Sequence, residues 1–497
     1  MTRPWDAEQL LAPWLVDPRL AARPVSGITL DSREVRPGSV FLALAGSRQH
    51  GLDFLDEALA AGAAVVLWEP DGRQDTAAVA ARCAARGAVD LPRAGLGALV
   101  SAMAARFHGD PGRDLRVVAV TGTDGKTSVA HYTAQLLHAL EGNSAVMGTL
   151  GWGLPDQLQA TRHTTSDAVT IQARLASLRD AGVRSVAMEV SSHALVQHRV
   201  DAVPFDVAVL THVGRDHLDY HGSVESYRAA KRRLFAWPGL RRQVLNLDDA
   251  VGRDLADRSK GGVEVLSYAA SHPADLQLTA VEPQPDGLAL TVAGHGRDHS
   301  LKLPLFGVFN ALNALAALGA IVDDQSMAPA LEAASRLRPV PGRMERFMAA
   351  DAPLAVVDYA HTAGALEAAL GALRPHVTGK LWCVFGCGGD RDTGKRPLMG
   401  EVAGRLADRV VLTSDNPRNE DPAAIIHDIS RGMPAGTDCR IVTDRAEAIA
   451  MAIAEAAPED GVLVAGKGHE TEQVIGAMAR PFSDRDRVRD LLQRRAG

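Results

Sequence analysis

Residues 117–128 read V-V-A-V-T-G-T-D-G-K-T-S, an apolar run that enters a glycine-rich turn. The apolar run predicts a buried strand, and we expect a helix to open at Lys126. Glycines let a backbone wrap closely around phosphate oxygens, and a helix N-terminus offers free N–H groups and a positive partial charge. Lys126 can reach terminal phosphates, and the Thr127 hydroxyl can bind Mg²⁺. The stretch therefore predicts a nucleotide-phosphate site.

The turn differs from the usual G-x-x-x-x-G-K-[ST] pattern, because Val120 stands where the first glycine would lie. We therefore assign it to a shorter T-G-T-D-G-K-T form, Thr121–Thr127, and a plain strand-to-helix turn is the alternative. Residues 122 to 128 are the candidate phosphate-binding positions: Gly122, Thr123, Asp124, Gly125, Lys126, Thr127 and Ser128.

Outward from this stretch, short Val/Ala/Leu-rich runs alternate with alanine-rich segments, which is typical of βαβ units and parallel sheets. We predict three α/β domains: residues 1–108, 109–338 and 339–497, with turns at Asp110-Pro111-Gly112 and Arg338–Gly342. Residues 276–292 alternate more regularly and predict an antiparallel insertion. The predicted strands are 116–120, 144–147, 185–190, 206–210, 243–247, 355–360, 381–385, 409–413 and 461–465.

The composition excludes several classes of protein. The 497 residues carry 53 Lys+Arg and 60 Asp+Glu, so 53 − 60 = −7, which argues against a nucleic-acid binder. With four cysteines and no apolar leader in the first twenty residues, we expect a protein of the reducing cytoplasm without a disulfide framework. Cys383 and Cys387 lack the partners of a zinc site.

The uncharged stretch 303–322 is long enough to span a membrane. It contains Pro304, Asn310 and Asn313, and asparagines near the middle of a span are costly in hydrocarbon. We interpret it as a strand end, a turn and a core helix, and we expect no membrane span.

Further polar groups follow the predicted strands of the middle domain. Glu189 ends strand 185–190, where a carboxylate can hold Mg²⁺ beside a phosphate. Residues 211–221 read T-H-V-G-R-D-H-L-D-Y-H, either a Mg²⁺ or Mn²⁺ site or a polar loop. Lys231 stands in a basic run, and from the residues alone we expect it at the surface.

In the last domain, three glycine-rich or polar turns follow strands: Gly386–Asp392, Asp415–Arg418 and Gly466–Glu470. Opposite charges on Arg391, Arg418 and Glu470 at neighbouring strand ends suit a zwitterion such as a free amino acid. Ordinary salt-bridged turns are the alternative.

Together these motifs resemble the Mur ligase family over essentially the whole chain. The resemblance rests on L-D-S-R (30–33), T-G-T-D-G-K-T, E-V-S-S-H-A-L (189–195), R-D-H-L-D-Y-H (215–221), G-V-F-N-x-x-N (307–313), G-C-G-G-D-R-D (386–392), D-N-P-R (415–418) and G-K-G-H-E (466–470). The narrower resemblance is to members that add the third amino acid of the peptidoglycan stem peptide. It implies a central P-loop-type sheet, a Rossmann-like C-terminal domain and a small N-terminal domain.

The resemblance also implies roles for single residues. ATP contacts are implied for residues 122–128, Asn310 and Arg343, with Asp358 near the nucleotide. Metal ligation is implied for Thr127, Glu189 and His217, with two Mg²⁺ ions expected, and Lys231 matches a carbamylated lysine. Contacts to the UDP-linked substrate are implied for Leu30, Ser32, Ser47, Arg48, Gln49, His163, Thr164, Thr165, Ser191, Gln197 and Arg199. Amino-acid contacts are implied for Arg391, Asp415, Asn416, Pro417, Arg418, Gly466 and Glu470.

The implied reaction is ATP-driven amide formation between UDP-MurNAc-L-Ala-D-Glu and meso-diaminopimelate, through an acyl phosphate. The implied partners are small molecules alone, and we expect a monomer. Alternatives are the same ligation with L-lysine, another member such as a folylpolyglutamate synthetase, or a phosphate-loop kinase or switch NTPase. The sequence departs from the family pattern at His163, His212 and Ala363, where Asn, Asn and Pro are usual.

Overall fold

The structure, a computed structural model, describes residues 5–46, 49–259, 261–323 and 326–496. Its contacts divide the chain into two compact units, residues 1–267 and 268–497. The division into three domains at residues 108 and 338 stays a prediction. The α/β fold class is confirmed, because parallel strands alternate with helices in both units.

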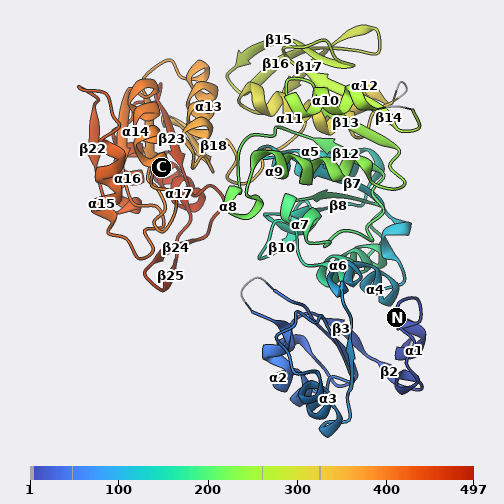
Figure 1. The fold of residues 1–497 in the computed structure, drawn as a ribbon. Coiled ribbons are helices and arrows are strands. Elements are labelled where there is room, and N and C mark those ends of the chain that lie inside the picture. The colour runs from blue at the N-terminus through green and yellow to red at the C-terminus, as the bar shows by residue number, and fades with distance from the viewer. Residues whose placement is uncertain (1–4, 47–48, 260, 324–325, 497) are drawn as a thin grey trace. The chain divides into compact units, whose positions relative to one another are not determined.

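The first unit begins with a small parallel sheet in the order β3-β4-β5-β6, drawn in blue in Figure 1. Helices α1 and α4 pack on one face of this sheet and α2 and α3 on the other. The bounds are β1 (Trp5–Asp6), α1 (Ala7–Leu11), β2 (Pro24–Val25), β3 (Gly27–Thr29), β4 (Ser39–Ala43), α2 (Leu55–Ala60), β5 (Val65–Trp68), α3 (Thr76–Ala85), β6 (Val89–Pro92) and α4 (Val100–Phe107).

The second sheet of this unit runs β10-β9-β8-β11-β7-β12-β13-β14, and its five strands from β8 to β13 are parallel. Its strands are β7 (Arg116–Thr121), β8 (Ser144–Gly148), β9 (Gly151–Leu154), β10 (Gln157–Gln159), β11 (Ser185–Glu189), β12 (Val207–Leu210), β13 (Arg242–Asn246) and β14 (Glu264–Ala269). Its helices are α5 (Lys126–Glu141), α6 (Ala168–Asp180), α7 (Ser192–Val196), α8 (Leu218–His221), α9 (Val224–Arg232) and α10 (Ala250–Arg258).

This topology places the motifs of the predicted middle domain at the carboxyl-terminal edge of the sheet. Strands β11, β7 and β12 are neighbours and parallel, so their carboxyl ends meet. The phosphate loop follows β7, Glu189 ends β11, and residues 211–221 follow β12. The helix predicted to open at Lys126 does so.

The second unit begins with an antiparallel part and two helices. Strands β15 (Leu276–Gln284), β16 (Gly287–Gly294) and β17 (Arg297–Leu303) form antiparallel pairs, as the alternation predicted. The stretch 303–322 follows as the end of β17, a turn and helix α11 (Val308–Gly319), as we expected. Helix α12 (Met327–Ala334) comes next. Among the helices of the described residues, none is long and apolar enough to cross a membrane.

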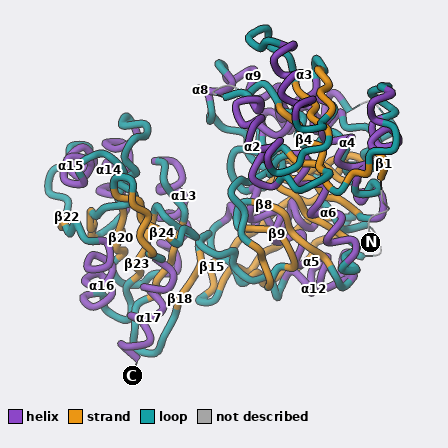
Figure 2. The backbone as a smooth tube through the Cα atoms, turned by 90° about the horizontal axis from the view of Figure 1, so that it is seen from below, coloured by secondary structure: helices purple, strands orange, loops and turns teal. Residues whose placement is uncertain are grey.

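The last sheet has the order β18-β19-β23-β20-β21-β22, parallel except for β18. Helices α13, α14 and α15 contribute to the core on one face, and α16 and α17 to the core on the other (Figure 2). The strands of this sheet are β18 (Glu345–Phe347), β19 (Leu354–Asp358), β20 (Leu381–Phe385), β21 (Arg409–Leu412), β22 (Cys439–Ile441) and β23 (Gly461–Ala465). Strands β24 (Glu472–Ile475) and β25 (Met478–Pro481) form a separate antiparallel pair. The helices are α13 (Ala363–Leu373), α14 (Lys395–Leu406), α15 (Pro422–Ser430), α16 (Arg445–Glu455) and α17 (Asp484–Ala496).

Candidate active site

The phosphate loop between β7 and α5 depends on two glycines. Gly125 has φ +83°, a left-handed conformation that residues with a Cβ rarely adopt. A Cβ on Gly122 would lie 1.8 Å from the Thr211 hydroxyl oxygen, so only glycine fits against β12. The loop thus leads directly into the start of α5, and N–H groups at a helix N-terminus are suited to phosphate oxygens.

Lys126 lies folded over this loop. Its Nζ donates to the carbonyl oxygens of Gly122 at 3.0 Å and Thr123 at 2.8 Å. The ammonium group is thereby held at the mouth of the phosphate cradle, where the sequence pattern expects a lysine to meet terminal phosphates.

Lys231 is buried beside the same loop, with only 1% of its surface exposed. Its Nζ donates to the Gly122 carbonyl oxygen at 2.6 Å and lies 4.6 Å from the centre of the Tyr227 ring. Burial, reinforced by the nearby positive charge of Lys126, lowers the pKa of Lys231 well below its ordinary value. The surface position expected from the basic run is therefore wrong: α9 turns Lys231 inward while Arg233 is exposed.

Glu189 joins β11 to the phosphate loop. Its carboxylate is fully buried and accepts from the Thr127 hydroxyl at 2.9 Å, from the Thr149 N–H at 2.7 Å and from the Thr149 hydroxyl at 3.2 Å. A hydroxyl and a carboxylate so close together supply the hard oxygen ligands that Mg²⁺ prefers, so Thr127 and Glu189 fit the ion.

His217, the third predicted metal ligand, is not brought into this contact. It has φ +51°, its Nε2 lies 3.3 Å from Asp216, and its ring lies 4.8 Å from that of His193. Within the described ranges, no group of three His, Cys, Asp or Glu side chains is arranged to hold a metal. Metal ligation by His217 stays a prediction.

Several residues predicted to contact the UDP-linked substrate form one network with Glu189. The Thr165 hydroxyl donates to the Glu189 carbonyl oxygen at 2.8 Å and accepts from the Ser191 N–H at 3.0 Å. Arg199 donates to the Thr165 carbonyl oxygen at 2.7 Å and to the Gln197 side chain at 3.0 Å. The Thr164 hydroxyl lies 3.0 Å from that of Thr149. His163, exposed, accepts from Thr161 only through its backbone.

The remaining predicted substrate contacts lie in the small N-terminal sheet region. The buried Ser32 hydroxyl donates to Glu57 at 2.7 Å, and Leu30 is half-buried. Gln49 is exposed. Ser47 and Arg48 lie outside the described residues.

In the second unit, the residues predicted to contact the nucleotide lie near its helix α11 and strand β19. Asn310 is 1% exposed and donates to the Phe306 carbonyl oxygen at 3.0 Å. The Arg343 guanidinium lies 4.4 Å from the centre of the Tyr359 ring. Burial raises the pKa of Asp358, which accepts from the Met344 N–H at 2.7 Å.

The predicted amino-acid contacts gather at the carboxyl ends of β20, β21 and β23. The Asn416 amide donates to Glu470 at 2.8 Å, and the Arg418 guanidinium donates to the Gly389 carbonyl oxygen at 2.7 Å. A Cβ on Gly466 would lie 2.5 Å from the Asp415 carboxylate, so glycine lets the two loops approach. Arg391 is exposed at the same loops, and Pro417 is buried between its neighbours.

Sequence comparison matches three family models along the chain: "Mur ligase family, catalytic domain" over residues 24–104, "Mur ligase middle domain" over 120–321, and "Mur ligase, glutamate ligase domain" over 342–468. A relative from Alkalilimnicola ehrlichii is 52% identical over 98% of this chain and 99% of its own. The chain belongs to the Mur ligase family. Members of this family are ATP-dependent amide ligases.

A further relative and a solved structure agree with this membership, and a second solved structure shares the fold. The Alkalilimnicola protein is named UDP-N-acetylmuramoyl-L-alanyl-D-glutamate--2,6-diaminopimelate ligase, and so is a Pseudomonas aeruginosa relative that is 48% identical over 94% of each chain. A solved structure of a ligase of the same name has a TM-score of 0.72 at 34% identity and covers 100% of both chains. The ADP complex of MurF ligase from Thermotoga maritima shares the fold, with a TM-score of 0.61 at 21% identity over 97% of this chain and 100% of its own.

The structure of this Mur ligase adds residues that sequence reasoning did not single out. Lys467 is fully buried and donates to the Asn416 side chain and to Glu470, each at 2.9 Å. Thr149 links Glu189 to Thr164 from the end of β8. Lys467 lies inside the quoted G-K-G-H-E motif, which was the available signal, whereas Thr149 has no local motif.

His212, one of the departures from the family pattern, has a defined place. Its Nδ1 lies 3.0 Å from Asp249, which also accepts from the Val213 N–H at 2.8 Å. The hydrogen bond with Asp249 raises the pKa of His212. With histidine in place of the family's usual asparagine, position 212, in the loop that follows β12, thus pairs with the buried Asp249.

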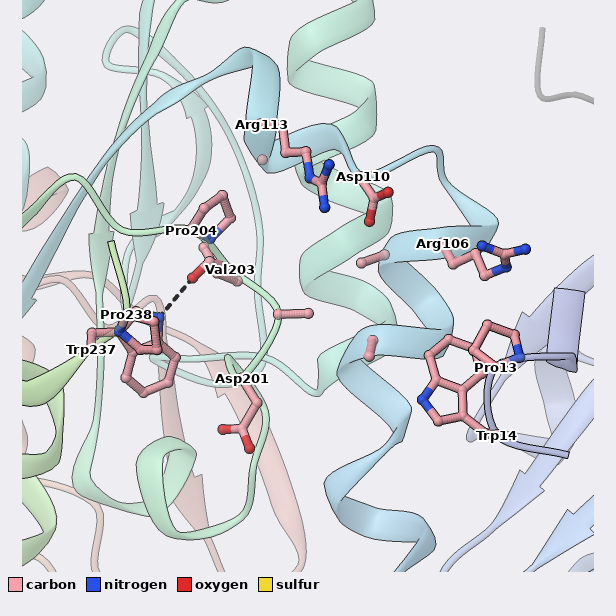
Figure 3. Close-up of a pocket in the computed structure, with 14 residues that line it drawn as sticks. Pro13, Trp14, Arg106, Asp110, Arg113, Asp201, Val203, Pro204, Trp237 and Pro238 are labelled. Carbon is pink, nitrogen blue, oxygen red and sulfur yellow. Dashed lines mark hydrogen bonds between the residues drawn. The ribbon is translucent and has the colours of Figure 1, made fainter. Parts of the chain in front are cut away.

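A pocket of about 400 Å³ lies in the first unit, away from these residues. Figure 3 shows Trp14 and Arg106 on one side and Trp237 and Pro238 on the other, with Asp110 and Arg113 at a third side. The lining residues include none of the predicted site residues. We therefore assign the candidate active site of this Mur ligase to the strand ends and not to this pocket.

Proposed function

We propose that the protein uses ATP to join meso-2,6-diaminopimelate to the D-glutamate γ-carboxylate of UDP-N-acetylmuramoyl-L-alanyl-D-glutamate. The observation that carries this is the relative at 52% identity over nearly both whole chains, which is named for this ligation. The chemistry of the candidate site supports this function. The phosphate loop and Glu189 lie at strand ends of the first unit, and oppositely charged side chains suited to an amino acid lie at strand ends of the last sheet.

The reaction has two bond-forming steps. A γ-carboxylate oxygen attacks the γ-phosphorus of ATP, the bond to the ADP oxygen breaks, and an acyl phosphate forms. The amine of the incoming amino acid then attacks the acyl carbon, the bond to phosphate breaks, and the amine releases a proton. Lys126 and the N-terminus of α5 stabilise the negative charge that gathers at the γ-phosphate.

Magnesium would supply further charge neutralisation between the carboxylate and the triphosphate, two anions that otherwise repel. Thr127 and Glu189 are the ligands whose geometry supports this proposal. His217 is kept as a proposed ligand from the family pattern.

We also propose that Lys231 is carbamylated. The chemistry needs a neutral amine: R–NH₂ and CO₂ give R–NH–COO⁻ and a proton. The lowered pKa of Lys231 favours that neutral form at a lower pH than for an ordinary lysine. The single N–H that remains can still donate to the Gly122 carbonyl oxygen, 2.6 Å away.

Amino-acid selection is proposed to reside at Arg418. Its guanidinium is planar and can pair with the distal carboxylate of diaminopimelate, which L-lysine lacks. In this structure its Nη1 donates to a backbone carbonyl, so pairing with a substrate carboxylate needs only a local exchange of partner.

The decisive experiment incubates the protein with ATP, Mg²⁺ and the UDP-linked dipeptide, and compares meso-diaminopimelate with L-lysine by product mass. We expect product with diaminopimelate and at least about a hundredfold lower kcat/KM with lysine, since an unpaired arginine is costly to leave in the site. Arg418→Met should narrow this ratio, and Arg440→Met, an exposed arginine on β22, is the control. Equal use of both amino acids would favour the lysine alternative.

A further inference from the structure

One carbonyl oxygen accepts from two lysines. Gly122 O receives the Nζ of Lys126 at 3.0 Å and the Nζ of Lys231 at 2.6 Å. The two amine groups therefore lie close together at one oxygen, and the Lys231 group is also buried and desolvated. A residue that contacts both the phosphate loop and Lys231 can hold this arrangement in place.

Tyr227 contacts both the phosphate loop and Lys231. It lies one helical turn before Lys231 on α9, and residues four apart share one face of a helix. Its ring centre is 4.6 Å from the Lys231 Nζ, and the residue is 1% exposed. Its hydroxyl oxygen lies 2.8 Å from the Thr123 hydroxyl oxygen, in the middle of the phosphate loop.

Thr123 holds the phosphate loop in place through several hydrogen bonds. Its N–H donates to the His212 carbonyl oxygen at 2.5 Å, and its hydroxyl oxygen accepts from the Gly214 N–H at 2.9 Å. The Tyr227 hydroxyl is a further partner of the Thr123 side chain and comes from a different element. It therefore ties α9, and with it Lys231, to the loop that is to hold the triphosphate.

We propose that Tyr227 is a positioning residue that locks the phosphate loop and Lys231 into one nucleotide-ready arrangement. This rests on the proposed ATP-dependent function. Without the hydroxyl, Thr123 has one anchor fewer, and the loop occupies the competent arrangement for a smaller fraction of the time. Apparent nucleotide affinity falls by that fraction, whereas the chemical step, once nucleotide is bound, is little affected.

The test is a double-mutant cycle on Tyr227→Phe and Thr123→Val, read by the KM for ATP, by kcat and by the binding of a fluorescent ATP analogue without turnover. One hydrogen bond of ordinary strength corresponds to about a fivefold effect. We expect Tyr227→Phe to raise the KM for ATP about fivefold with kcat within about twofold. Adding it to Thr123→Val should change nothing more, because the shared bond is already lost.

Two comparisons separate positioning from general stability. Thr123→Ser keeps the hydroxyl, so adding Tyr227→Phe to it should still raise the KM for ATP about fivefold, unlike adding it to Thr123→Val. Tyr268→Phe, which removes a hydroxyl from another tyrosine that is 1% exposed, should leave the KM for ATP unchanged. Tyr227→Leu also removes the ring beside Lys231 and should lower kcat as well as affinity.

Several outcomes would overturn the proposal. They are an unchanged nucleotide affinity in Tyr227→Phe with only a lower melting temperature, or effects of the two single variants that multiply in the double variant. Failure of the underlying function looks different, because the unaltered protein would then bind the nucleotide analogue yet form no product with any amino acid.

Discussion

At the residue scale, Lys231 shows how position changes chemistry. In water its amine is a cation at neutral pH, but here burial and the nearby Lys126 lower its pKa. Its basic neighbours by themselves indicate an exposed helix face, and in the sequence only the family resemblance singled Lys231 out. Only its contact with the Gly122 carbonyl oxygen reveals a buried amine beside the phosphate loop.

We expect Lys231 to bind CO₂ as a carbamate that is detectable by ¹³C NMR after incubation with ¹³C-bicarbonate. Because its pKa is lowered, its neutral, reactive form persists to lower pH than for an ordinary lysine, so the carbamate signal should persist to lower pH than a carbamate on an exposed lysine. Lys231→Met should abolish the signal. Lys302→Met, which alters an exposed lysine on β17, should leave it unchanged. An identical signal in Lys231→Met would contradict the assignment.

At the element scale, a buried ion pair connects two helices to loops that follow strands of the last sheet. Arg445, at the start of α16, makes two hydrogen bonds of 2.7 Å with Asp484, at the start of α17, and both side chains are fully buried. Arg445 also donates to the carbonyl oxygens of Ala465 at 2.9 Å and Ser414 at 3.3 Å. The pair thus joins both helices to the two loops predicted to hold the amino acid.

Asp484→Asn should lower the free energy of unfolding by about 3–5 kcal/mol, because it leaves a buried guanidinium without its counter-charge. Asp486→Asn is the matched control: its partner Arg489 is 44% exposed, and an exposed pair contributes about 0–1 kcal/mol. Urea denaturation followed by circular dichroism measures both. A similar loss of unfolding free energy in the two variants would contradict a special stabilising role for the buried Arg445–Asp484 pair.

At the scale of the whole molecule, the proposed reaction draws on both units, since the phosphate loop belongs to residues 1–267 and the Arg418 loops to 268–497. No single element carries the activity. The family pattern therefore includes motifs across the whole chain, and the proposed ligation depends on all three substrates being bound.

We expect phosphate release from ATP only when both the UDP-linked dipeptide and meso-diaminopimelate are present. A kinase or switch NTPase would release phosphate without an amino acid. A coupled phosphate assay with each substrate omitted in turn measures this. Substantial release without diaminopimelate would argue for the NTPase alternative, and Lys126→Ala, which removes the phosphate-loop ammonium, is the background control.

Much of this protein is determined by local sequence. The strands at 381–385 and 461–465 and the helix opening at Lys126 were predicted correctly, because continuous apolar runs and glycine-rich turns leave the backbone few other choices. Most other strand ends differ by a residue or two, since hydrogen bonding frays there. The motif order was also sufficient for the family, which the relatives confirm.

Tertiary structure alone decided which polar residues meet. The burial of Lys231, the hydroxyl contact between Tyr227 and Thr123, and the place of Thr149 beside Glu189 join residues far apart in the chain. A sequence pattern reports neighbours along the chain, whereas desolvation and hydrogen bonding depend on neighbours in space. Parallel strands from distant segments, aligned at one sheet edge, create those neighbours and hence the chemistry.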